Sequence, residues 1–209
     1  MTTLSTPNPI PIDPGVKRRA IIFLAIAGTI LWIPVARLML GRPPGFLRDL
    51  GFFSGASGTP LAWALGILVA LAYCAYAIRS PLVAHYWRRV SLLKLFAIII
   101  AIAAAIVEEA FFRRIVMDGV LAAGGGPLLQ ILASALVFGG AHGIWGIVTR
   151  RIFVGIGVMV ATGTLGAALA VVYLVGDRSL AAPIVSHFLI TATIQPGIMF
   201  AAFSGHMRW

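Results

Sequence analysis

Two adjacent carboxylates inside an apolar segment are the residues of this chain best suited to chemistry. Glu108 and Glu109 are the only glutamates among the 209 residues, and the run between Lys94 and Glu108 is entirely apolar. An ionised side chain at the centre of a membrane span costs about 2.5–3.5 kcal/mol on insertion scales, and such residues usually mark functional sites. The glutamate pair therefore indicates a functional site within a membrane-embedded helix.

Helix geometry predicts different roles for the two glutamates. Arg113 follows Glu109 by four residues, and an acid placed four residues before a base is the favourable order for an ion pair on a helix. Glu108 points about 100° away from Glu109. We therefore expect Glu109 and Arg113 to form a structural pair, and Glu108 to face the helix bundle, available for general acid or base catalysis.

Two histidines in later apolar segments strengthen this interpretation. His142 ends the segment FGGAH that starts at Phe138, and His187 follows Ser186, with Thr191 one helical turn later. Glycines beside His142 allow another helix backbone to approach closely. A single buried histidine is more often a packing residue than a catalytic one. Two histidines together with a glutamate pair predict one polar site at the interface of the third, fourth and sixth spans.

The composition indicates how these residues are positioned. The chain is 60% hydrophobic and only 11% charged, and apolar runs of about 20 residues, long enough to cross a bilayer, recur along it. We predict an all-α fold, a polytopic transmembrane helix bundle of about six spans, with no separate soluble domain. The expected spans are about 20–40, 60–78, 127–148, 152–175 and 179–203, together with a third helix that begins near 92 and ends before the glycine break at 124–126.

The charge pattern predicts membrane topology rather than a nucleic-acid partner. The net charge is +10, but the basic residues form short clusters between apolar runs. Cytoplasmic loops are enriched in Lys and Arg, and with six spans ten basic residues fall on one side and three on the other. This bias favours a multi-pass protein of the cell membrane with both termini in the cytoplasm. Cys74 is the only cysteine, which excludes an intrachain disulfide and a thiolate metal cluster.

Three motifs in order along the chain resemble those of a known family. The pattern EExxxR covers Glu108 to Arg113, FxxxH covers Phe138 to His142, and a further histidine follows at His187. This combination resembles the CAAX-prenyl-protease and bacteriocin-processing family, whose members are intramembrane endopeptidases. The resemblance extends over about 108–191. The family's last motif is usually HxxxN, and here Thr191 stands at the position of the asparagine.

The resemblance implies a peptide hydrolase without a cofactor. Glu108, assisted by His142, would activate a water molecule, and His187 with Thr191 would stabilise the oxyanion; the supporting residues would be Glu109, Arg113 and Phe138. The partners would be membrane lipid and a membrane-associated protein or peptide substrate. The expected domains are a disordered cytoplasmic tail at 1–18 and an integral membrane protease-like domain at 19–209, with the motifs in its core at 92–203.

Two other interpretations stay open from the sequence. Two histidines and a glutamate are a known catalytic zinc set, so a zinc-dependent protease is one rival, although no HExxH motif is present because Gly146 follows His142 at that spacing. The second rival is a non-enzymatic membrane protein, such as a bacteriocin self-immunity factor or a small transporter, that uses the same buried charges.

Overall fold

The computed structural model describes residues 13–41, 45–53 and 57–204, and within these ranges every regular element is a helix. Six helical segments are long and apolar enough to cross a membrane, as predicted. They are α1 (Pro14–Gly41), α3 (Pro60–Ala77), a continuous segment formed by α5 (Leu92–Glu109), η1 (Ala110–Met117) and α6 (Asp118–Ala122), the pair α7 (Pro127–His142) and α8 (Ile144–Thr149), α9 (Ile152–Val175), and α10 (Ala181–Ser204). The all-α polytopic bundle is therefore confirmed.

The first helix begins earlier than the sequence analysis expects. The Asp13 carboxylate accepts a hydrogen bond of 2.8 Å from the Gly15 amide, and Pro14 occupies the first helical position, an arrangement that favours helix initiation. The expected boundary of the disordered tail at residue 18 is therefore wrong for 14–18, which are helical. The rest of that expected tail, 1–12, lies outside the described residues.

A π-helical segment divides the third span. η1 begins directly after Glu109, so the two glutamates stand at the end of regular α-helix, and eight residues of wider helix follow them. π-Helical turns are rare and occur frequently at functional sites, because they re-aim the side chains that follow. Nothing in the sequence analysis anticipates this change of helix type.

Close backbone packing holds α7 against α9. A Cβ atom added at Gly139 of α7 would lie 2.6 Å from the carbonyl oxygen of Met159 of α9, and one added at Gly166 of α9 would lie 3.0 Å from the Cβ atom of Phe138 of α7. Only glycine permits such approach, as in other membrane helix pairs. This contact fixes α7, and therefore Phe138 and His142, relative to α9.

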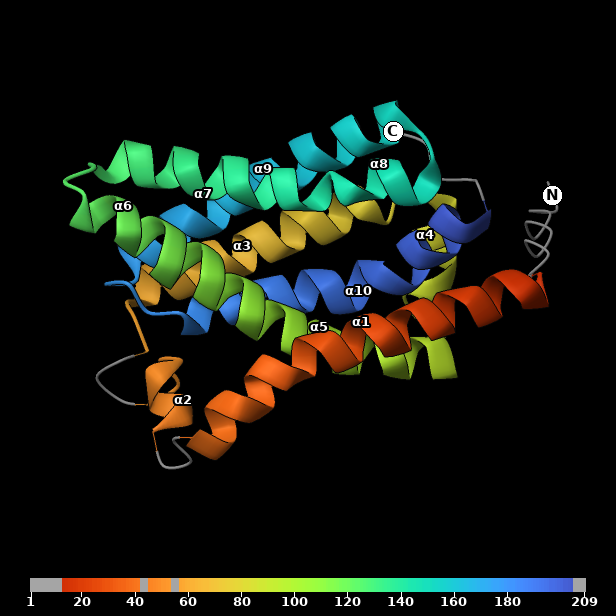
Figure 1. The fold of residues 1–209 in the computed structure, drawn as a ribbon, viewed down its shortest axis with the longest axis horizontal. Coiled ribbons are helices and arrows are strands. Elements are labelled where there is room, and N and C mark those ends of the chain that lie inside the picture. The colour runs from red at the N-terminus through yellow and green to blue at the C-terminus, as the bar shows by residue number, and fades with distance from the viewer. Residues whose placement is uncertain (1–12, 42–44, 54–56, 205–209) are drawn as a thin grey trace, which may run out of the picture.

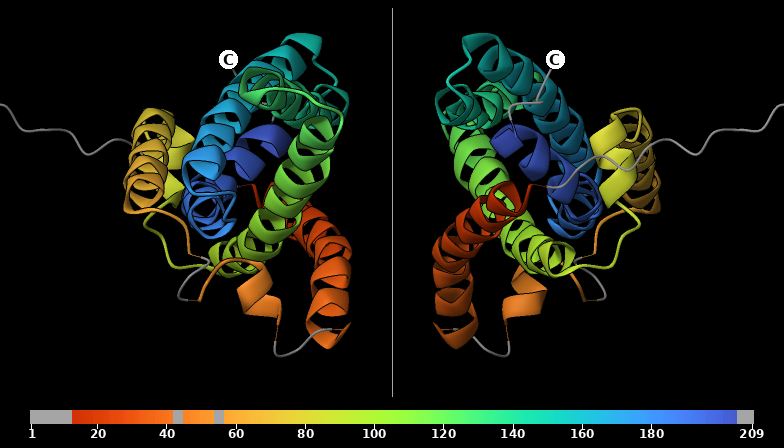
Figure 2. Two further views of the ribbon diagram at one scale, coloured as in Figure 1. Left: turned by 90° about the vertical axis from the view of Figure 1, so that its left-hand side faces the viewer. Right: turned by 90° about the vertical axis from the view of Figure 1, so that its right-hand side faces the viewer.

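The last span lies at the centre of the bundle. α10 contacts α1, α3, α4 (Pro81–Tyr86), α5, α8 and α9, and Figures 1 and 2 show it enclosed by the other long helices. Neither α4 nor the short α2 (Phe46–Asp49) is anticipated by the sequence analysis. Its central position makes α10 the helix against which the site is assembled.

A lysine completes the hydrogen bonding of α10. Pro196 lies inside this helix and has no amide hydrogen, so the carbonyl of Ala192, four residues earlier, loses its helical donor. The Lys94 Nζ atom of α5 lies 2.5 Å from that carbonyl oxygen and donates to it. This bond links α5 and α10 on one side of the site.

Candidate active site

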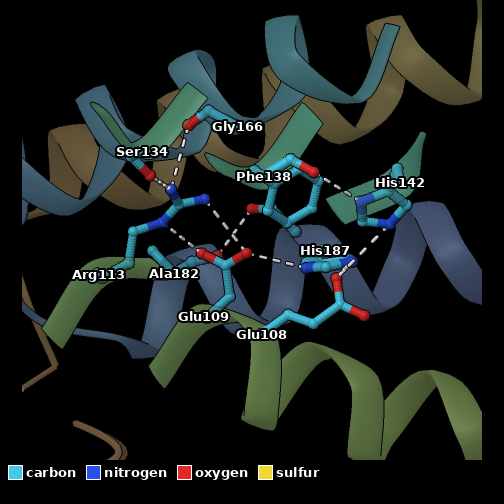
Figure 3. A network of polar contacts seen from close by, with 10 residues as sticks. Glu108, Glu109, Arg113, Ser134, Phe138, His142, Gly166, Ala182 and His187 are labelled. Atoms are coloured by element: carbon cyan, nitrogen blue, oxygen red, sulfur yellow. Dashed lines mark hydrogen bonds and ion pairs between the residues drawn. The ribbon is translucent and has the colours of Figure 1, made fainter. Parts of the chain in front are cut away.

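A buried ion pair forms the base of the site. The Arg113 Nε atom donates to Glu109 Oε2 at 2.7 Å, and Arg113 Nη2 donates to Glu109 Oε1 at 3.3 Å; both side chains are fully buried. This is the four-residue pair that helix geometry predicts, and Figure 3 shows it to the left of the two histidines. Because each charge neutralises the other and two bonds join them, the pair is compatible with an apolar interior.

Two further groups hold the guanidinium, and sequence analysis missed both. Arg113 Nη1 donates to the hydroxyl of Ser134 on α7 and, at 3.2 Å, to the carbonyl oxygen of Gly166 on α9. The signal for Ser134 is its spacing, since it lies four residues before Phe138 and eight before His142, on one face of α7. No sequence signal identifies a backbone carbonyl such as that of Gly166. Arg113 thus ties η1 to both α7 and α9.

His187 connects the ion pair to the second glutamate. Its Nδ1 atom lies 2.9 Å from Glu109 Oε1, and because an ionised carboxylate only accepts hydrogen bonds, Nδ1 carries the hydrogen. The other ring nitrogen, Nε2, lies 3.8 Å from Glu108 Oε2. A carboxylate behind a histidine fixes the tautomer and the ring orientation, so Glu109 aims His187 Nε2 at Glu108.

His142 approaches Glu108 in the same way from a different helix. Its Nδ1 atom lies 2.9 Å from the carbonyl oxygen of Phe138, which can only accept, so Nδ1 again carries the hydrogen. Nε2 lies 3.8 Å from Glu108 Oε2. Two imidazoles from α7 and α10 therefore direct the same nitrogen to one carboxylate oxygen of α5.

Glu108 stands at the centre of this arrangement without a direct partner. Its Oε2 atom is buried and has no hydrogen bond within the described part of the chain, although the side chain as a whole is 23% exposed, like that of His142 at 24%. The 3.8 Å separation from each Nε2 exceeds hydrogen-bond length. Each separation leaves room for a small polar group between Glu108 Oε2 and the facing Nε2 atom.

Phe138 packs against the two histidines and the arginine of the cluster. Its ring stacks on His142 with centroids 4.7 Å apart, meets His187 edge to face at 5.7 Å, and lies 6.0 Å from the Arg113 guanidinium carbon. Phe138 is itself 1% exposed. It is therefore a shared apolar contact of the two imidazoles and the guanidinium inside the bundle.

The structure brings together six of the seven candidate residues of the sequence analysis, at the expected interface of α5–η1, α7 and α10 (Figure 3). Thr191 is the exception. It lies one turn after His187 on α10 and is half-buried, but no hydrogen bond among the described residues joins it to the cluster. The hydroxyl at the position of the family's asparagine is therefore not part of the resting network.

The spacing of the site's side chains indicates how well they could hold a metal ion. Among the described residues no group of three or more His, Cys, Asp or Glu side chains is arranged to hold a metal ion. Glu108 Oε2 lies 3.8 Å from Nε2 of His142 and of His187, compared with roughly 3.4 Å between tetrahedral zinc ligands bound at about 2.0–2.1 Å. A small contraction would be needed, and the Glu109 carboxylate would then support His187 as a ligand.

A second polar cluster lies at the end of the bundle where α6, α7 and α9 meet. Arg178 Nε donates to Asp118 Oδ1 at 3.0 Å, Arg178 Nη1 donates to Gln130 Oε1 at 3.1 Å, and the Tyr173 hydroxyl donates to Asp118 Oδ1 at 3.2 Å. Asp118 and Arg178 are 38% and 30% exposed. This cluster joins helix ends and contributes nothing to the glutamate–histidine site.

Residues 90–193 match the family model described as Rce1-like, type II CAAX prenyl endopeptidase Rce1-like. The matched segment contains all seven candidate residues and runs from just before α5 into α10. No curated protein and no solved structure matches the chain.

Proposed function

Because the chain belongs to the CAAX prenyl endopeptidase family through residues 90–193, a family of CAAX-type intramembrane proteases, we propose that it hydrolyses a peptide bond with water activated by Glu108. The observation that carries the mechanism is the convergence of two Nε2 atoms on Glu108 Oε2 at 3.8 Å each.

The protonation of the histidines supports a water-binding role for Glu108. In the neutral form of His142, Nδ1 donates to Phe138, so Nε2 is a hydrogen-bond acceptor that faces another acceptor, Glu108 Oε2. A water molecule between these two acceptors, which lie 3.8 Å apart, can donate one hydrogen to each of them. A water held by both groups has its oxygen lone pairs free to attack a carbonyl carbon.

The proton transfers then balance around Glu108. As the water oxygen bonds to the scissile carbonyl carbon, Glu108 takes one water proton and becomes a carboxylic acid. The tetrahedral intermediate collapses with cleavage of the C–N bond, and the new acid gives that proton to the departing amine. The second water hydrogen remains on the product carboxyl group, and Glu108 returns to its starting state.

His187 is suited to stabilise the oxyanion. When protonated, it donates from both nitrogens, from Nδ1 to Glu109 and from Nε2 toward the developing negative charge. Fixed donors in a site that excludes water are among the largest contributions to catalysis. Thr191, half-buried one turn along the same helix, supplies a further hydroxyl on that side. Glu109 acts through His187 and is a positioning residue.

The substrate is a peptide or protein segment delivered within or at the membrane, because the site lies inside the helical bundle. We place the protein in the cell membrane with both termini in the cytoplasm, as the excess of basic residues on one side of the bundle indicates. The mechanism requires no cofactor. Its protein partner is the substrate itself, and membrane lipid surrounds the exposed apolar faces of the helices.

A zinc-dependent version of the same protease is the second candidate, favoured by the common orientation of the two Nε2 atoms and by the carboxylate behind His187. A bound zinc ion would polarise the scissile carbonyl and lower the pKa of a bound water. Glu108, His142 and His187 are the residues that would hold it. Chelation distinguishes the two versions.

The proposed function is tested by replacing Glu108 with glutamine in the host cell, a change that keeps the shape of the side chain and removes its basic character. Membrane peptides are then compared by mass spectrometry between cells with the native chain and with E108Q. The proposal expects at least one membrane-associated precursor to accumulate uncut in the E108Q cells. Identical peptide profiles in both cells contradict it and favour an immunity factor or a transporter.

A further inference from the structure

An open groove between α3 and α9 has no role in the proposed mechanism. Its volume is about 610 Å³, within the range of small-molecule sites, roughly 300–1,000 Å³. The Tyr73 hydroxyl of α3 donates to the carbonyl oxygen of Ala161 on α9 and so joins the two walls. The walls include Ala72, Tyr73 and Tyr76 of α3 and Gly157, Val160 and Thr164 of α9. Because these side chains are mostly small or apolar, the groove suits a hydrocarbon chain.

The groove opens to the lipid around the bundle. At 100° per residue, the three groove residues of α9 named above point within about 60° of one another. Gly166, which packs against Phe138 of α7, points about 120–180° away from all three. Val160 is 65% exposed and Tyr76 is 62% exposed. The groove therefore lies on the side of α9 that is turned away from α7 and from His142.

Three arginines lie at the end of the bundle where α3 ends and α9 begins (Figure 1). Arg79 follows the end of α3 by two residues, and Arg150 and Arg151 directly precede α9. All three are exposed, and none makes an ion pair or a side-chain hydrogen bond with another residue that the structure describes. Neither α3 nor α9 contains an acidic residue. An apolar groove and a group of unpaired cations thus share one end of the bundle.

Distances along the two helices match those of a phospholipid. α3 and α9 run in opposite directions (Figure 1), and the bond between Tyr73 and Ala161 sets their register. Arg79 lies six residues after Tyr73, and Arg151 lies ten residues before Ala161, so both lie toward the same end, by about 9 and 15 Å of helix rise. Half of the hydrocarbon core of a bilayer is also about 15 Å. A headgroup beside these arginines would place its acyl chain along the groove, within one leaflet.

We propose that this groove binds one anionic phospholipid, with the headgroup phosphate beside Arg79, Arg150 and Arg151 and an acyl chain between α3 and α9. Guanidinium groups match the geometry of phosphate, and basic clusters at a membrane surface attract anionic lipids. Tyr76, whose hydroxyl makes no hydrogen bond within the described ranges, lies between the two, at the level where tyrosine is enriched. With the orientation proposed above, the lipid belongs to the cytoplasmic leaflet.

Charge distinguishes this occupant from two others. A prenyl chain would fill the groove but carries no charge for the arginines. A second copy of this chain, with a net charge of +10, would bring further arginines of the same sign. An anionic lipid satisfies both the groove and the cations. The inference goes beyond the proposed function and does not depend on it.

Native mass spectrometry of the purified full chain, freed of bound lipid, tests the headgroup contact. The probes are a phosphatidylglycerol and a phosphatidylcholine with identical acyl chains. We expect the wild type to bind the phosphatidylglycerol at least about tenfold more tightly, and replacement of all three arginines by glutamine to remove this preference. The control replaces Lys17, Arg18 and Arg19 of α1 by glutamine. It removes the same charge from the same end of the bundle (Figure 1) and should keep the preference.

A tryptophan in the groove tests the acyl-chain contact. Val160→Trp should weaken the binding of both lipids about tenfold, because the indole occupies the space of the chain. The matched control is Val171→Trp. Val171 points to the same side of α9, about 16 Å farther along the helix; it is 39% exposed and does not line the groove, so this variant should bind both lipids like the wild type.

Several results would overturn the inference. Equal affinity of the wild type for the two lipids, or an equal loss of preference in both triple variants, would show that the arginines select no headgroup. Equal binding by Val160→Trp and the wild type would show that the groove holds no acyl chain. Tighter binding of farnesol than of phosphatidylglycerol would assign the groove to a prenyl group, and conversion of a dimer to a monomer by Val160→Trp would assign it to a second copy. None of these results bears on the proposed function, because no cleavage is measured.

Discussion

Glu109 and His187 are 78 residues apart in sequence and share a hydrogen bond of 2.9 Å between the carboxylate and Nδ1. This bond is the point at which the buried ion pair of the third span meets the histidine of the sixth. It gives the two neighbouring glutamates distinct tasks, since Glu109 orients His187 while Glu108 faces the Nε2 atoms. The site therefore depends on the ion pair of Glu109 with Arg113, although Glu109 does not itself contact the substrate in the proposed mechanism.

Removing the charge of Glu109 should destabilise the fold as well as the site. Glu109→Gln leaves the Arg113 guanidinium buried without a counter-charge, and breaking a buried pair from one side costs about 3–5 kcal/mol. We expect the free energy of unfolding in detergent or bilayer, measured by denaturant titration, to fall by that amount. The control is Asp118→Asn, which removes the partner of the partly exposed Arg178 and should cost about 0–1 kcal/mol. Equal losses for the two variants would argue against a buried ion pair at Glu109.

The neighbouring glycines of the FGGAH segment should respond oppositely to alanine. At Gly139 a new Cβ atom would lie 2.6 Å from the Met159 carbonyl oxygen, whereas at Gly140 it would meet nothing within 4 Å. Gly139→Ala should therefore separate α7 from α9 and destabilise the protein by about 1–3 kcal/mol. Gly140→Ala should be neutral or stabilising by up to about 1 kcal/mol, since alanine favours helix. Thermal unfolding of the two variants decides the matter, and a destabilising Gly140→Ala would contradict the described packing.

The bond from Lys94 to Ala192 should matter only while Pro196 is present. Lys94→Met removes the donor to the carbonyl that the proline leaves free, at a cost of about 1.5–3 kcal/mol for a charged hydrogen bond. In a Pro196→Ala background the alanine amide can bond to the same carbonyl, so Lys94→Met should cost clearly less. A double-mutant cycle on unfolding free energies measures this difference. Additive effects of the two substitutions would show that lysine and proline are independent.

The sequence allowed the fold to be predicted well, because apolar length and charge placement are local properties. The six spans and the Glu109–Arg113 pair follow from residue counts and helical spacing alone. The start of α1 at Pro14 was missed although Asp13 and Pro14 form a recognisable initiation signal. The π-helical η1 could not be predicted, since local residue types do not distinguish it from α-helix and its packing against α7 is a tertiary contact.

The sequence predicted which residues come together at the candidate site, but not which of their atoms are hydrogen-bonded. Spacing and residue type identify Glu108, His142 and His187, but which ring nitrogen faces Glu108 is set by acceptors on other turns and helices, the Phe138 carbonyl and the Glu109 carboxylate. The guanidinium contact with the Gly166 carbonyl is a backbone contact, and backbone groups leave no trace in a sequence.

The central claim is that Glu108 is the base that activates water and that no metal ion is needed. The cleavage rate of the purified protein in proteoliposomes tests this claim most directly. The rate is measured for the wild type and for Glu108→Gln on the same peptide, each with and without a zinc chelator. We predict that the wild type keeps its rate in chelator and that the folded Glu108→Gln variant loses about 10²–10⁴-fold, the range of general acid–base catalysis. Undiminished cleavage by Glu108→Gln would contradict the role of Glu108, and a wild-type rate abolished by chelator and restored by zinc would contradict the metal-free mechanism.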